Sequence, residues 1–121
     1  MLLITSNKSR QLLHIRYAGR VRPEEFLRSR EELVAQLGEL SEGFRLLADF
    51  SQLESMKLDC EPELGRMMEL IGQAGVTLVV RVIPDPSKDI GMNILTAFHY
   101  PHRPRVVACR NLIEAARTLG F

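Results

Sequence analysis

Hydrophobic residues along this chain form short unbroken runs that alternate with helix-spaced stripes. Three runs are almost wholly apolar, at residues 44–50, 76–83 and 105–109. Strands buried on both faces show such unbroken Val, Ile and Leu runs, whereas half-exposed strands alternate apolar and polar residues. Each run lies between segments with helical spacing. The pattern therefore predicts an α/β fold with a mixed, mostly parallel sheet.

The beginning of the chain predicts a β-hairpin instead. Residues 2–5 and 11–17 have strand character, and the turn-forming residues 6–9 separate them. In the second strand Leu13, Ile15 and Tyr17 alternate with more polar neighbours, so one face is expected to be buried. Gly19 is expected to end this strand.

Four segments have the three- and four-residue spacing of amphipathic helices. Proline stands at the expected first turn of three of them (Pro23, Pro62 and Pro86), and Asn111 is a suitable N-cap for the fourth. The stripe of the third helix begins at Ile90. Between the central strand at residues 44–50 and the helix that follows it, residues 51–61 are polar and predict a long loop. The apolar stripe of the first helix consists of Phe26, Leu27, Leu33, Val34, Leu37 and Leu40. The predicted order is β-β-α-β-α-β-α-β-α.

The composition predicts one globular domain spanning residues 1–121. The chain is 45% hydrophobic, its formal net charge is +1, and only 6% of its residues are aromatic, so no nucleic-acid partner is expected. Residues 1–4 are too short an apolar segment for a secretory leader, and no run approaches the roughly 18 apolar residues of a membrane span. The two cysteines do not form a close-spaced disulfide framework. A cytoplasmic protein is expected.

Charge is unevenly distributed along the chain. The first thirty residues carry seven Lys and Arg side chains against Glu24 and Glu25, and residues 31–69 reverse this, with ten acidic side chains against three basic ones. Two interpretations stay open. The charges belong either to solvated faces that attract each other within the chain or to a bipolar surface that orients a protein partner or a second copy.

The element order and several segments together resemble the STAS superfamily, and most closely its SpoIIAA-like branch, named after anti-sigma-factor antagonists. The matching features are a strand-Gly-helix opening, an aspartate that ends the central strand and a Glu-Ala pair after the last strand. They stand here at residues 14–26, at Asp49 within LLADFS (46–51), and at Glu114-Ala115 within RVVACRNLIEAARTLGF (105–121). The resemblance implies a STAS/SpoIIAA-like fold over nearly the whole chain.

The resemblance also implies a non-enzymatic regulatory module that needs no cofactor and docks a protein, such as a kinase or an anti-sigma-like regulator. Many relatives carry a phosphorylated serine in an Asp-Ser-Ser-Gly motif at the helix start after the central strand. The matching region here lacks that motif, and Asp59 and Cys60 come nearest to its position. Asp59 is then either a permanent acidic cap in place of the modifiable hydroxyl or a plain N-cap. The expected partner-binding residues are Ser55, Met56, Lys57, Leu58, Asp59, Cys60 and Glu61.

Three other candidate sites have simple chemistry. His102, Arg103 and Arg105 are an expected contact for a phosphate or a partner's carboxylate. His99 and His102 have no third ligand nearby in sequence, so no metal site is expected. A thiol at a helix N-terminus is activated, but Asp59 and Glu61 beside Cys60 oppose this and no histidine lies near it in sequence, so catalysis is not expected.

Two alternatives to protein docking remain. Met67, Met68 and Met92 would suit a pliable pocket between sheet and helices that carries a small apolar or lipid-like ligand. An enzyme is the other alternative, although no nucleophile-base pair or metal triad can be assembled from the sequence. An exposed edge strand from the hairpin would also support a dimer.

Overall fold

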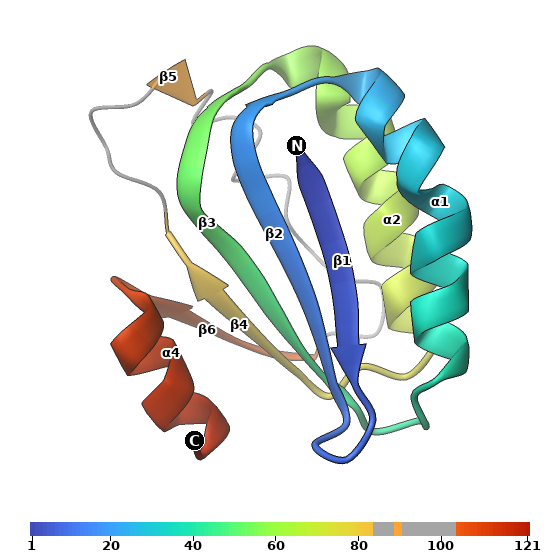
Figure 1. Cartoon of the computed structure of the whole chain (residues 1–121), viewed down its shortest axis with the longest axis vertical. Helices are drawn as coiled ribbons and strands as arrows, with labels where there is room; N and C mark the ends of the chain where they lie inside the picture. Colours follow the sequence, from blue (N-terminus) through green and yellow to red (C-terminus); the bar gives the residue numbers. More distant parts are fainter. Residues whose placement is uncertain (84–88, 91–103) are drawn as a thin grey trace.

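The computed structural model describes residues 1–83, 89–90 and 104–121. In these parts a sheet is flanked by helices on its two faces (Figure 1). The elements in chain order are β1 (Leu2–Asn7), β2 (Leu12–Val21), α1 (Pro23–Gly38), β3 (Arg45–Met56), the 3₁₀ helix η1 (Leu58–Cys60), α2 (Glu61–Gln73), β4 (Leu78–Val82), β5 (Asp89–Ile90), β6 (Arg105–Cys109) and α4 (Leu112–Leu119).

The sheet confirms the predicted mixed, mostly parallel arrangement. Its strand order is β1-β2-β3-β4-β6, and β5 pairs with the far end of β3. Among the described strands only β1 runs antiparallel to its neighbour, within the predicted hairpin. The three apolar runs lie side by side and parallel, with Leu46 opposite Val79 and Val79 opposite Val106. Parallel neighbours require crossover connections, and among the described residues α1 provides the one between β2 and β3 and α2 the one between β3 and β4.

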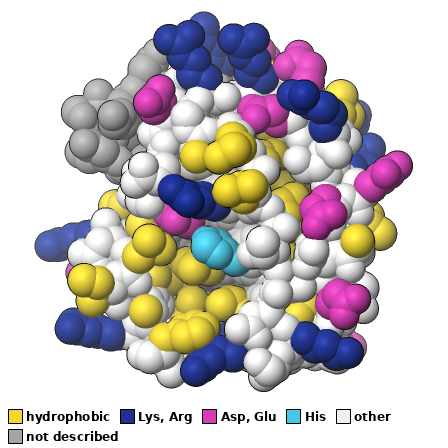
Figure 2. Space-filling model, viewed as in Figure 1, with side chains coloured by type: hydrophobic (Ala, Val, Ile, Leu, Met, Phe, Trp, Pro, Cys, Tyr) yellow, Lys and Arg dark blue, Asp and Glu magenta, His cyan; other side chains and the backbone are white. Residues whose placement is uncertain are grey.

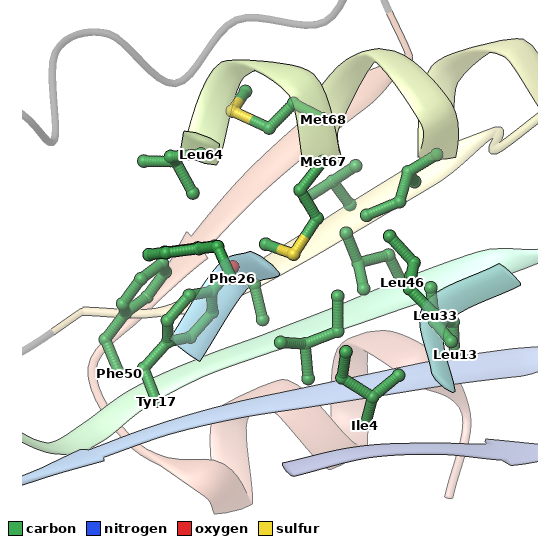
Figure 3. Close-up of a cluster of buried hydrophobic side chains, with 14 of the residues drawn as sticks. Ile4, Leu13, Tyr17, Phe26, Leu33, Leu46, Phe50, Leu64, Met67 and Met68 are labelled. Atoms are coloured by element: carbon green, nitrogen blue, oxygen red, sulfur yellow. The ribbon is translucent and has the colours of Figure 1, made fainter. Parts of the chain in front are cut away.

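The larger core lies between the sheet and the helices α1 and α2 (Figure 3). The inward face of β2 is the predicted one, because Leu13, Ile15 and Tyr17 are all buried. Tyr17 stacks on Phe50 of β3 with ring centroids 4.3 Å apart and an angle of 15° between the planes. On the opposite face α4 packs Ala115 and Leu119 against β4 in a smaller core.

Gly75 follows α2 and lies against the connection between α1 and β3, which contains Glu42 and Gly43. Its φ of +97° lies in the left-handed region that favours glycine. A Cβ atom added there would lie 2.5 Å from Cγ of Glu42 and 3.2 Å from its Cα. The Gly75 carbonyl also accepts a hydrogen bond of 2.8 Å from the Gly43 N–H. This contact joins the loops before β3 and β4.

Two predicted strand ends are wrong. Strand β2 continues through Gly19 to Val21, because a register irregularity between Gly19 and Arg20 lets the pairing with β3 resume. The expected loop at residues 51–61 is strand as far as Met56. There β3 pairs with β2 on one side and with β5 on the other. Asp49 therefore lies in the middle of the central strand, not at its end.

The helix predictions need two corrections. Helix α1 ends at Gly38, and its buried stripe is narrower than expected, because Leu27 and Val34 are 52% and 54% exposed. The predicted third helix falls mostly on residues 86–88 and 91–98, outside the described residues. Within it, Asp89–Ile90 form strand β5, so the helix prediction is wrong there. None of the helices in the described ranges is long and apolar enough to cross a membrane.

Candidate functional site

The carboxyl ends of β2 and β3 meet at one edge of the sheet because the two strands are parallel. Arg20 lies opposite Ser55, and Val21 lies opposite Met56. Helix α1 starts two residues after β2, and η1 starts two residues after β3. Ligands of α/β sheets bind at this kind of edge, where the connections after parallel strands come together.

A pocket of about 710 Å³ opens at this edge. Three of its side chains are basic (Arg20, Arg22, Lys57) and three are acidic (Glu24, Glu54, Asp59); Val21, Pro23 and Ser55 complete the lining. Lys, Arg, Asp and Glu side chains lie together at the same end of the molecule, at the top of Figure 2. Such a lining is charged but has no net formal charge, and it differs from the mostly apolar pockets of small-molecule sites.

The predicted partner-binding residues divide into two groups. Ser55, Lys57 and Asp59 line the pocket, Leu58 is 52% exposed beside it, and Glu61 is exposed at the first position of α2. The other two, Met56 and Cys60, are fully buried in the core. A partner cannot touch Met56 or Cys60, so the prediction is wrong for these two residues as contacts.

Asp59 does not cap α2. The N-cap of this helix is Cys60, whose side chain makes no capping hydrogen bond, and Asp59 lies one residue earlier inside η1. Both readings of Asp59 as a cap are therefore wrong. Its carboxylate keeps a negative charge at the pocket all the same.

Burial makes the Cys60 thiol unreactive. The Sγ atom donates to the Val21 carbonyl at 3.5 Å. Burial raises the pKa of Cys60 to about 11, and the neighbouring Asp59 carboxylate adds to the increase because the thiolate would be negative too. The expectation that Cys60 is not a nucleophile thus has a physical basis, since the thiolate is the reactive form.

We expect Cys60 to be alkylated by iodoacetamide at about pH 8 at least ~100-fold more slowly in the folded protein than in urea, because the thiolate fraction falls about tenfold per pKa unit. Mass spectrometry of peptides separates Cys60 from Cys109, which is also free and buried. Equal rates in the folded and unfolded chain would show that Cys60 is accessible and ionised.

Two acidic residues near the pocket are already paired with basic groups. Glu63 binds Arg30 of α1 at 3.2 Å and Arg66 at 2.8 Å, and Glu25 binds the N-terminal ammonium at 2.9 Å. The Arg30–Glu63 pair joins the basic beginning of the chain to its acidic middle, as the first interpretation of the charge distribution expects. The charges that line the pocket make no ion pair within the described parts of the chain.

The predicted anion contact is not brought to this site. Arg105 is the first residue of β6 and pairs with Leu78 at the start of β4, so it lies toward the opposite end of the parallel strands. His99, His102 and Arg103 lie outside the described residues. Among the residues that are described, no group of three or more His, Cys, Asp or Glu side chains is placed to hold a metal ion.

A second polar group lies on the sheet face opposite α1 and α2. Asp49 of β3 is 2% exposed and accepts a hydrogen bond of 2.9 Å from the Ser51 N–H. Arg16 lies opposite Asp49 in the register, and His14 precedes Arg16 by two residues on the same face. Burial lowers the pKa of His14, while the charge of Asp49 opposes this shift. The imidazole is therefore mostly neutral at pH 7.

Sequence reasoning missed the half of the pocket that precedes α1. Arg20, Arg22 and Glu24 come from the end of β2 and the beginning of α1, and Glu54 comes from the extension of β3. The signal that could have found them is the pairing itself. If β2 is parallel to β3, then residues after Gly19 must lie beside residues after 51.

Comparison with known proteins identifies the fold. No protein-family model and no curated protein matches the chain. Among solved structures, the anti-sigma factor antagonist SpoIIAA in its unphosphorylated form has a TM-score of 0.59 and 20% sequence identity, with all of both chains covered. The Bacillus cell fate determinant SpoIIAA in the phosphorylated form has a TM-score of 0.58 and 20% identity, with 98% of this chain and 99% of the other covered. The chain therefore has the SpoIIAA-like fold that the resemblance implied.

Proposed function

We propose that this chain is a regulatory module without catalytic activity that docks a partner protein at the carboxyl edge of β2 and β3. The docking surface consists of the exposed residues Arg20, Arg22, Glu24, Glu54, Lys57, Leu58, Asp59 and Glu61 and the half-buried Ser55. The observation that carries the proposal is the convergence of two separate segments, 20–24 and 54–59, on one pocket in a SpoIIAA-like fold.

Leu58 is the proposed anchor of the contact. It is 52% exposed and stands between Lys57 and Asp59, both of which line the pocket. Interfaces commonly place a buried apolar side chain at the centre of a polar rim, and the central residue contributes most of the binding energy. The surrounding charges of both signs would set the orientation and the specificity of the partner.

The proposed class of partner is suggested by the proteins that share the fold. Two solved structures of this fold are described as the anti-sigma factor antagonist SpoIIAA in its unphosphorylated form and the cell fate determinant SpoIIAA in the phosphorylated form. We propose an anti-sigma-like regulator or a kinase as the partner here. Asp59 would supply a permanent negative charge at the surface, so that binding needs no phosphorylation of this chain. Phosphate on Ser51 or Ser55 after incubation with ATP and cell extract would overturn this constitutive role.

The test compares partner capture by surface variants with capture by matched controls. Leu58→Glu and Asp59→Lys should each weaken capture about tenfold or more, because each removes a central contact or reverses its charge. The controls Ile113→Glu on α4 and Glu39→Lys after the end of α1 make the same chemical changes at exposed positions away from the docking surface. They should bind as the wild type does.

A docked protein must meet both conditions: it is captured by the wild type and the controls, and it is lost with the two surface variants. Quantitative mass spectrometry of the captured proteins provides the measurement. Unchanged capture by Leu58→Glu and Asp59→Lys would refute the docking surface.

Transport of a small apolar ligand remains the alternative function, but the methionines that suggested it have a packing role. Met67 and Met68 are 6% and 2% exposed and pack in the larger core (Figure 3). Met92 lies outside the described residues. Native mass spectrometry of the freshly purified protein separates the two functions, since a retained apolar molecule would favour the carrier.

A further inference from the structure

Strand β1 forms one edge of the sheet. It pairs with β2 alone among the described strands, and its six residues, LLITSN, contain no charge and no proline. The pairing with β2 is regular from Leu2 to Asn7, without a bulge. Soluble proteins normally protect a sheet edge with charges, prolines or bulges, because a bare edge pairs with other strands. The edge of β1 lacks all three.

The hydrogen bonds at the start of β1 show which backbone groups face outward. Met1 and Ala18 exchange both bonds of an antiparallel pair: Ala18 N–H donates to the Met1 carbonyl at 2.8 Å, and the Met1 nitrogen donates to the Ala18 carbonyl. Bonded and non-bonded pairs alternate along an antiparallel ladder. Leu3, Thr5 and Asn7 therefore bond to β2. The N–H and C=O groups of Leu2, Ile4 and Ser6 point away from β2.

We infer that this edge binds β1 of a second copy of the chain, antiparallel and about a two-fold axis. An outward-facing residue of one copy must pair with an outward-facing residue of the other, and these are every second residue of β1. The two-fold axis must therefore pass through a residue that lies opposite its own equivalent in the second copy. Ile4 opposite Ile4 meets this condition and places Leu2 opposite Ser6 of the second copy. All three outward-facing residues then form bonded pairs. Leu3, which is 43% exposed, lies opposite Thr5 of the second copy.

Charges at the two ends of the edge fit a second copy only in the antiparallel arrangement. Lys8 follows one end of β1, and Glu25 of α1 lies at the other end, where it binds the Met1 ammonium. An antiparallel partner strand brings Lys8 of each chain to the Glu25 end of the other. Glu25 is already paired with the Met1 ammonium, so Lys8 of the second copy meets no net charge there. A parallel arrangement would instead place the two Lys8 side chains beside each other, so the charges support the antiparallel one.

One charge near the axis opposes the pairing. Helix α1 runs along β1, since Glu25 contacts Met1 and Gln36 accepts a hydrogen bond from Ser6. Glu32 lies between these contacts on the same helix face, at spacings of seven and four residues. It is exposed and accepts a hydrogen bond from Gln36 at 2.7 Å. The two Glu32 side chains would face each other near Ile4, so the dimer should be weakened by their repulsion.

The test measures self-association by sedimentation equilibrium between roughly 10 μM and 1 mM protein. Leu3→Lys places a charge on the bare edge and should weaken association about tenfold or more. Val34→Lys is the matched control, because Val34 is similarly exposed (54%) on α1. Glu32→Gln should strengthen association severalfold. Equal thermal unfolding of Leu3→Lys and Val34→Lys shows that the fold is intact.

Amide exchange tests the register. At high protein concentration the N–H groups of Leu2, Ile4 and Ser6 should gain protection, whereas those of Leu3, Thr5 and Asn7 should keep the protection that they already have. A monomer throughout the concentration range, or association unaffected by Leu3→Lys, would overturn the inference. The docking surface lies at the carboxyl ends of β2 and β3 and not along the edge strand β1, and it is tested with a different partner. Either proposal can therefore fail alone.

Discussion

Replacing Phe50 with alanine should lower the free energy of unfolding by about 3–5 kcal/mol. Phe50 is 1% exposed, and its ring stacks on Tyr17 at a centroid distance of 4.3 Å. Tyr17 in turn contacts Phe26 of α1, with ring centroids 6.5 Å apart. Loss of the Phe50 ring removes buried apolar area and leaves a cavity between β2, β3 and α1, where the surrounding side chains can relax only in part.

Urea unfolding followed by circular dichroism measures this change. The control is Val34→Ala on α1, because the Val34 side chain is 54% exposed and does not belong to the core. This control should change the free energy of unfolding by less than about 0.5 kcal/mol. A loss below about 1 kcal/mol for Phe50→Ala would contradict the close packing of the two rings.

Gly75→Ala should lower the free energy of unfolding by about 2–3 kcal/mol, for a reason unrelated to apolar packing. Alanine must adopt the φ of +97°, which is unfavourable for residues with a Cβ atom. The new methyl group would also lie 2.5 Å from Cγ of Glu42. The side chain of Glu42 can move away, but its Cα at 3.2 Å cannot move without shifting the connection before β3.

Gly65→Ala is the matched control for this variant. Gly65 lies inside α2, and nothing stands within 4 Å of an added Cβ atom. The substitution should raise the free energy of unfolding by about 0.5–1 kcal/mol, since alanine favours the helix and restricts the unfolded chain. Opposite signs for the two substitutions, measured by urea unfolding, are the expected result. Equal effects would show that the backbone at Gly75 is not constrained.

The parallel core strands could be predicted because strands buried on both faces have an almost unbroken apolar sequence. Val79, Val80 and Val82 are all fully buried, and residues on both faces of β4 contribute to the two cores. The extension of β3 could not be predicted in this way. Its outward positions are polar, and only Leu53 and Met56 point into the core, so this stretch has the composition of a loop. Pairing with β2 overrides that local tendency.

The candidate site was predictable only along its own segment. Lys57, Leu58 and Asp59 follow a recognisable strand, and the resemblance to a known family pointed to them. The burial of Cys60 depends on a contact with Val21, 39 residues earlier in the chain. Spacing within one segment carries no information about such a contact, nor about the approach of Arg20 to Ser55.

Strand β3 is much longer than its neighbour β4. Its first five residues pair with strands on both sides, whereas beyond Asp49 it no longer pairs with β4. The distal part is nevertheless held on both sides, since Ser55 and Met56 pair with β2 and with β5, and Leu53 and Met56 are buried in the larger core. A partner that docks beside it would therefore meet a platform whose shape is set by the same packing that stabilises the fold.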